Sequence, residues 1–157
     1  MNDHYQIIND PSQEIYKKLD EHINTFWDWS KTQEQKMEWE TNYLDWSLIC
    51  TITERLFETT DHTDWARRTV NNLLYIIARD NECEIIIGQL TKNPSSFLFL
   101  AKEALFYSDY DARWQFAHYL TRILYKCPDA MEVLLRYTED NVEYVRRRAI
   151  EAMKTIN

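Results

Sequence analysis

The chain has 157 residues, of which 45% are hydrophobic and 28% are charged, which is typical of one globular domain. One glycine and three prolines argue against turn-rich β folds and against glycine-rich phosphate-binding loops. The formal net charge of −8 argues against general binding to nucleic-acid phosphates. We therefore expect an all-α chain in which residues 1–157 form a single domain.

Helix-start signals and apolar periodicity divide the chain into helices with short connections. Capping residues or first-turn prolines mark expected starts at Asp10-Pro11, Ser30, Asp61, Asn93-Pro94, Ser108, Cys127-Pro128 and Asp140. The expected helices span 11–29, 32–59, 62–79, 82–92, 94–107, 110–126, 128–138 and 141–156, and a break near Thr41-Asn42 stays open. Two expected buried stripes are Ile15, Leu19, Ile23 and Phe26, then Leu44, Leu48, Ile52 and Leu56.

The N-terminal third is acidic and rich in tryptophan. Residues 1–60 carry 12 of the 26 acidic side chains, 5 of the 18 Lys and Arg side chains and four of the six Trp. Positions i and i+2 diverge by about 200° around a helix, so some of these rings should be partly exposed. Carboxylates attract a basic protein and ring faces anchor it, so we expect a binding surface here; a cap over the end of the fold is the alternative. The candidate residues are Trp27, Trp29, Glu38, Trp39 and Glu40.

Three of the expected helices share a pattern in which an apolar residue precedes an arginine. Further apolar residues follow at positions 4, 7, 8 and 11 after the first, and the arginines are Arg67, Arg113 and Arg146. These offsets form one continuous helical stripe, which predicts a buried face. Amphipathicity does not explain the arginine, because any polar residue would suit that position.

The third copy of this pattern, in residues 140–153, resembles the second helix of a HEAT repeat, with Met153 at the usual leucine position. The second copy departs further, because Phe116 and Tyr119 stand where the family has small residues. The resemblance covers residues 61–157 and implies antiparallel helix pairs in a short right-handed α-solenoid, with residues 1–60 as a helical N-terminal cap. It also implies that Arg146 pairs with an acidic neighbour. An irregular helical bundle is the alternative.

In a solenoid of this family the second helices line the concave side, which implies a ladder of exposed side chains. Trp, Tyr and Arg dominate interaction hot spots, so a tryptophan in this ladder suggests an interface. Packing of Trp114 on an adjacent helix is the equal alternative. The candidate partner-binding residues are Arg68, Tyr75, Trp114, His118 and Arg147.

The sequence offers little catalytic chemistry. The four histidines do not pair at helical spacing, and the sequence has neither a Cys-x-x-Cys nor a Gly-x-Ser-x-Gly motif, so we expect no catalytic residues, metal or cofactor. HEAT-like folds include a family of alkyl-purine DNA glycosylases, which implies an alternative function. Such an enzyme needs a basic face and a carboxylate beside a ring-lined cleft. Residues 61–157 carry 13 basic and 14 acidic side chains, which disfavours it.

The start of the sequence has no signal-peptide pattern, and its apolar runs are too short to span a membrane. Cys50, Cys83 and Cys127 are widely spaced among apolar neighbours, so we expect buried, reduced thiols and a cytoplasmic location. We therefore expect a non-enzymatic protein-binding module, such as an immunity-type inhibitor of a basic nuclease toxin. Another protein is the expected partner; a membrane is not expected, and nucleic acid is disfavoured.

Overall fold

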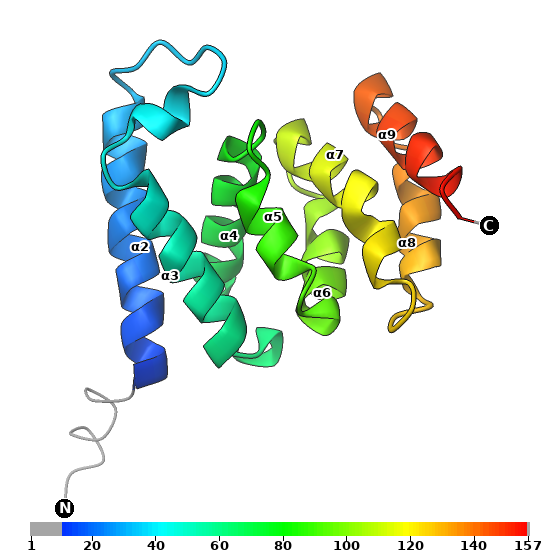
Figure 1. The fold of residues 1–157 in the computed structure, drawn as a ribbon, viewed down its shortest axis with the longest axis horizontal. Coiled ribbons are helices and arrows are strands. Elements are labelled where there is room, and N and C mark those ends of the chain that lie inside the picture. The colour runs from blue at the N-terminus through cyan, green and yellow to red at the C-terminus, as the bar shows by residue number, and fades with distance from the viewer. Residues whose placement is uncertain (1–10, 157) are drawn as a thin grey trace, which may run out of the picture. The chain divides into compact units, whose positions relative to one another are not determined.

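The structure is a computed structural model that describes residues 11–156 (Figure 1). Within these residues it is helical and contains no strand, which confirms the all-α prediction. The predicted cap at Asp10 lies outside the described residues. The elements are α2 (Pro11–Ser30), η1 (Trp39–Asn42), α3 (Trp46–Thr59), η2 (His62–Asp64), α4 (Arg67–Arg79), α5 (Ile85–Leu90), α6 (Pro94–Ala104), α7 (Tyr110–Tyr119), η3 (Leu120–Ile123), α8 (Ala130–Tyr137) and α9 (Glu143–Met153).

The chain divides into two compact units, Met1–Asn72 and Leu73–Asn157, with the boundary inside α4. In the first unit α2 and α3 pack side by side and run in opposite directions (Figure 1). Leu19, Ile23 and Phe26 are buried along α2, as the periodicity predicts. The leucine stripe predicted for the next helix is wrong in its first half, because Leu44 is 93% exposed and Leu48 is 41% exposed.

The predicted helix over residues 32–59 is also wrong in its first half, whereas the break left open near Thr41-Asn42 is observed, since η1 ends at Asn42 and α3 begins at Trp46. Ser30 is the last residue of α2, and its hydroxyl donates to the carbonyl oxygen of Trp27 instead of capping a following helix. Helix α3 begins at Trp46, so the face that α3 buries starts at Trp46 and Ile49, and Leu48 points to solvent. Met37 has a left-handed φ of 55°, which helps the connection to turn back toward α2.

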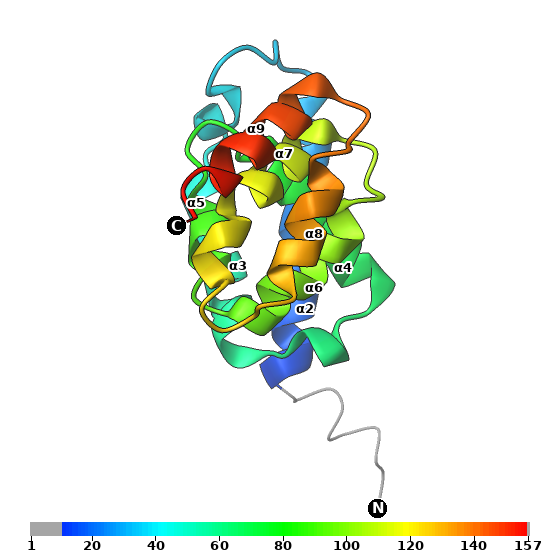
Figure 2. The same ribbon diagram turned by 90° about the vertical axis from the view of Figure 1, so that its right-hand side faces the viewer.

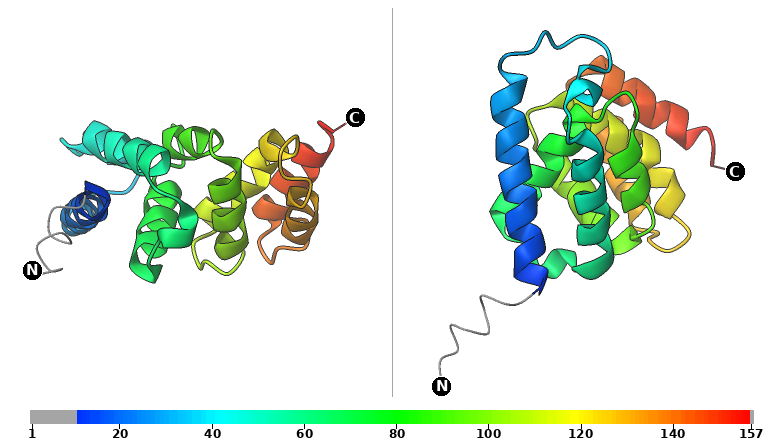
Figure 3. Two further views of the ribbon diagram at one scale, coloured as in Figure 1. Left: turned by 90° about the horizontal axis from the view of Figure 1, so that it is seen from below. Right: turned by 60° about the vertical axis from the view of Figure 1, so that its left-hand side comes forward.

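The second unit has two helical layers. Helices α6 and α8 lie in one layer with residues 73–79 of α4, and α5, α7 and α9 lie in the other (Figures 2 and 3). The first copy of the arginine pattern, in α4, is therefore not equivalent in space to the copies in α7 and α9, which pack against each other. In those two copies the apolar stripe is largely buried, as predicted; Met153 and Ile156 at the end of the third copy are the more accessible members.

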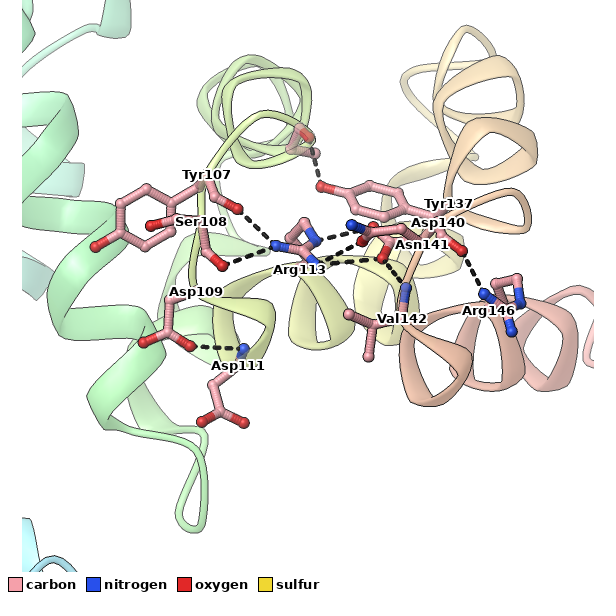
Figure 4. A network of polar contacts seen from close by, with 11 residues as sticks. Tyr107, Ser108, Asp109, Asp111, Arg113, Tyr137, Asp140, Asn141, Val142 and Arg146 are labelled. Atoms are coloured by element: carbon pink, nitrogen blue, oxygen red, sulfur yellow. Dashed lines mark hydrogen bonds and ion pairs between the residues drawn. The ribbon is translucent and has the colours of Figure 1, made fainter.

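Arg113 shows why an arginine follows the apolar residue in the second copy of the pattern. Its guanidinium binds the carboxylate of Asp140 from Nε (2.8 Å) and Nη2 (3.3 Å), and both side chains are only 7% exposed. Nη1 also donates to the carbonyl oxygens of Tyr107 (2.7 Å) and Ser108 (3.2 Å) (Figure 4). Arg113 thereby ties the start of α7 to the connections that precede α7 and α9.

Two aspartates repeat this arrangement 31 positions apart. Asp109 accepts from the backbone N–H of Asp111 (3.0 Å), and Asp140 accepts from that of Val142 (2.9 Å) (Figure 4). Asp109 also pairs with Arg79, as Asp140 pairs with Arg113. The cap of α7 is thus Asp109 and not the predicted Ser108.

Candidate functional site

The α2–α3 end, defined as residues 27–48, presents large apolar side chains to solvent. Trp27 is 49% exposed and Met37 is 85% exposed, and Leu44 and Leu48 share this segment. An apolar patch on the surface of a soluble domain often marks an interaction site. Exposed Trp27 also confirms that not all rings of the N-terminal third can face inward.

A cluster of aromatic rings lies behind this surface. Phe26 is fully buried, and its ring centroid lies 5.3–5.7 Å from those of Trp29, Trp39, Tyr43 and Trp46. Trp29 and Trp39 are half-buried because they also stack on each other at 5.8 Å. Through these ring contacts, residues 39–46 pack against α2. Trp29 and Trp39 therefore stabilise the fold of this surface and expose only part of their rings.

The charged candidates of this end have opposite outcomes. Glu38 is exposed, as expected for a residue that attracts a basic partner. Glu40 is fully buried, so its expected exposure is wrong. It lies in the 3-10 turn η1, which folds back beside the ring cluster, whereas the prediction placed it on the surface of a helix over residues 32–59. Lys31 pairs with Asp28, and Lys36 pairs with Glu34.

Within the second unit, the members of the predicted ladder of exposed residues do not form one surface. Arg68 belongs to the first unit, where it is exposed and pairs with Asp20. Tyr75 is half-buried on α4, in the other layer from α7 and α9, and the Arg79 guanidinium lies 5.6 Å from its ring centroid. Arg147 on α9 is exposed and lies over the ring of Tyr144 at 5.2 Å.

Trp114 is 6% exposed, so the alternative in which it packs on an adjacent helix is the one observed. Its indole N–H donates to Asp111 at 3.0 Å. The edge of Tyr144 meets the ring at 5.6 Å, and the Arg148 guanidinium lies 5.1 Å from its centroid. The helical period placed Trp114 on the outer face of α7, and α9 covers that face.

His118, one turn along α7 from Trp114, is half-buried. Burial lowers the pKa of its imidazole, and the nearby positive charges of Arg148 and Arg122 lower it further, while Glu151 opposes the shift. His118 therefore stays neutral at physiological pH and adds no charge to this face.

The residues around Trp114 form a hollow, the α7–α9 cleft, with a volume of about 610 Å³. Its lining residues are Asn81, Glu82, Glu84, Tyr110, Asp111, Trp114, Val142, Tyr144 and Arg148. Sequence reasoning missed four important members of this set: Glu84, Asp111 as a partner of Trp114, Tyr144 and Arg148. They come from segments up to 64 positions apart, so no local spacing marks them as a group.

Glu84 is the most constrained residue of the cleft. It has a left-handed φ of 54°, which is uncommon for a residue with a side chain. Its Oε1 atom is enclosed and has no hydrogen-bond partner. Burial raises the pKa of this carboxyl, although the charge of Arg148 and a hydrogen bond with Tyr119 act in the opposite direction.

Among residues 11–156, no group of three or more His, Cys, Asp and Glu side chains is arranged to hold a metal ion. Within the same range, no helix is long and apolar enough to cross a membrane. Cys50 is buried and Cys127 is half-buried, but Cys83 is exposed in the α4–α5 connection, so the prediction of three buried thiols is wrong for Cys83.

Comparisons of the chain with models of known protein families, with curated proteins and with solved structures found no match. The resemblance of residues 140–153 to a HEAT repeat therefore stays a prediction.

Proposed function

We propose that the chain is a non-catalytic protein-binding module, and that its α2–α3 end binds a basic protein. The observation that carries this proposal is the exposure of Trp27, Met37 and Leu44 in a segment that has four carboxylates besides the buried Glu40 and only two lysines. Carboxylates such as Glu38 accelerate the approach of a positively charged partner. The apolar side chains then lose their contact with water, which stabilises the complex.

A stoichiometric inhibitor fits this arrangement, because a small acidic chain can cover the basic substrate-binding face of an enzyme such as a nuclease toxin. We propose such an immunity-type role in the cytoplasm, on a HEAT-like scaffold of helix pairs. The support for the scaffold is the pattern shared by α7 and α9 and the repeated aspartate–arginine arrangement at their N-terminal ends.

One observation favours the DNA glycosylase alternative: Glu84 is a half-buried carboxylate beside the rings of Trp114 and Tyr144. Charge opposes it, since three carboxylates and one guanidinium line the α7–α9 cleft and would repel phosphates. We expect no measurable binding of duplex DNA at physiological salt. Binding there, together with release of an alkylated base, would replace the proposed function with this alternative.

The proposed function is tested by affinity capture from the source cell's lysate at low and high salt, with mass spectrometry of the bound proteins. We expect one basic protein near one-to-one stoichiometry, with its association rate falling as salt shortens the Debye length from about 10 Å at 0.1 M to about 3 Å at 1 M. A salt-independent association rate would contradict the role of charge.

Matched variants localise the surface. Glu38→Lys and Glu58→Lys change the net charge equally, but Glu38 lies at the α2–α3 end and Glu58 is exposed near the opposite end of α3. We expect Glu38→Lys to weaken binding about ten-fold and Glu58→Lys to change it about two-fold or less. Equal effects of the two variants would show that the partner does not contact the α2–α3 end.

A further inference from the structure

The α7–α9 cleft combines aromatic ring faces with an excess of negative charge. Tyr110, Trp114 and Tyr144 supply the rings, while Glu82, Glu84 and Asp111 supply three carboxylates against the single guanidinium of Arg148. Ring faces attract cations because the π-electron quadrupole places negative charge there. Carboxylates around such rings add a direct charge attraction and accept N–H hydrogen bonds.

The cleft already holds one cation from the chain itself. The Arg148 guanidinium lies 5.1 Å from the centroid of Trp114 and 5.9 Å from that of Tyr144, which are distances at which a cation is attracted to a ring. Asp111 holds the Trp114 ring through the indole N–H, so the ring does not have to reorganise to receive a cation. These contacts show that both rings can pack against a guanidinium.

The contacts of Arg148 are nevertheless incomplete. Its Nε is enclosed without a hydrogen-bond partner, and its Nη1 lies 4.0 Å from Glu151, beyond hydrogen-bond distance. Across the cleft lining, Glu84 Oε1 is also enclosed without a partner. Displacement of Arg148 toward Glu151 can expose both a ring face and Glu84 Oε1 to a second cationic group that enters the cleft.

We propose that the α7–α9 cleft binds the arginine or lysine side chain of a partner protein, in competition with Arg148. The inference extends the proposed function, because a basic partner would supply this side chain. It uses different residues in a different unit, however, and it can be tested without the partner.

The test is titration of the full chain with N-acetylarginine amide, followed by the ¹H–¹⁵N signal of the Trp114 indole. The neutral analogue N-acetylcitrulline amide is the control, since it keeps the shape and loses the charge. We expect the arginine probe to shift the signal in a saturable way and the citrulline probe to leave it unchanged. Equal shifts with both probes, or none with either, would overturn the proposal.

Two variants separate a cation site from an anion site. Glu84→Gln removes the carboxylate and should weaken binding of the arginine probe about five-fold, whereas Arg148→Gln removes the internal competitor and should strengthen it about three-fold or more. Lys154→Gln, which removes an exposed positive charge at the C-terminal end of α9 and outside the cleft lining, is the matched control and should leave the affinity within about two-fold. Loss of binding in Arg148→Gln, or tighter binding of acetate than of the arginine probe, would show that the cleft is an anion site.

A further variant separates the test of the cleft from the test of the α2–α3 end. Glu38→Lys should leave arginine-probe binding unchanged, because Glu38 does not line the cleft. If the probe binds and Glu38→Lys captures the basic protein as well as the natural chain does, the cleft inference stands and the role of the α2–α3 end fails. Displacement of the probe by duplex DNA at physiological salt would instead assign the cleft to a nucleic acid and overturn a protein partner.

Discussion

The α2–α3 end and the α7–α9 cleft have similar compositions and opposite exposures. Both place tryptophan beside carboxylates, yet Trp27 is 49% exposed and Trp114 is 6% exposed. Trp27 lies on the outer face of α2, whereas α9 brings Tyr144 and Arg148 over the outer face of α7. Helical period therefore identifies a face, but the next packed element decides whether that face meets water.

The same contrast holds for ion pairs in the two units. Arg68 and Asp20 in the first unit are 68% and 26% exposed, whereas Arg113 and Asp140 in the second are each 7% exposed. An exposed pair stays hydrated and contributes little to stability. In a buried pair both charges have lost their contact with water, so each charge is stabilised mainly by the other. The same residue types therefore have different energetic roles in the two units.

The largest expected effect comes from breaking the buried pair. Arg113→Met leaves the Asp140 carboxylate buried without its guanidinium, and it removes donors from two backbone carbonyls. We expect the free energy of unfolding in urea to fall by about 3–5 kcal/mol. Arg68→Met is the matched control in the first unit and should cost about 1 kcal/mol or less. Similar losses in both variants would contradict the contrast between the two pairs.

The tryptophan comparison is tested by the same truncation at both sites. Trp114→Ala removes a packed ring from beneath Tyr144 and Arg148, and we expect it to cost about 3 kcal/mol or more. Trp27→Ala removes an exposed ring and should change stability by about 0.5 kcal/mol. Urea unfolding of both variants measures the difference. If Trp114→Ala leaves stability unchanged, the ring is not part of the packed α7–α9 contact.

Much of the helical fold could be predicted from local signals, because caps and apolar stripes are encoded within a few neighbouring residues. The start Asn93-Pro94 and the stripe of Leu19, Ile23 and Phe26 are examples that the structure confirms. The break over residues 31–45 depends on rings that meet in three dimensions. Local periodicity therefore extended a helix through a segment that folds back onto α2.

The candidate surface could be predicted only in part. Trp27 and Glu38 follow from composition and from the divergence of neighbouring positions on a helix. The α7–α9 cleft could not, because Glu84, Trp114 and Tyr144 belong to three separate segments. The left-handed backbone of Glu84 also carries no sequence signal, since such positions usually hold glycine or asparagine.

The smallest expected effect is a pH dependence that distinguishes the enclosed carboxylate of the cleft from exposed ones. Burial holds the pKa of Glu84 above its ordinary value of 4.5. The folded chain therefore retains this proton at pH values where the unfolded chain has released it. The free energy of unfolding consequently falls as pH rises from the unfolded pKa through the raised folded pKa.

Glu84→Gln removes this loss, because glutamine has no proton to release. We expect the melting temperatures of the variant and the natural chain to agree below about pH 4 and to separate as pH rises, with the variant the more stable above the raised pKa. Glu139→Gln, which removes an exposed carboxylate outside the cleft, controls for the change in net charge. A separation that is constant across pH would show that Glu84 acts through packing, whereas one that grows with pH assigns the effect to ionisation of an enclosed carboxylate.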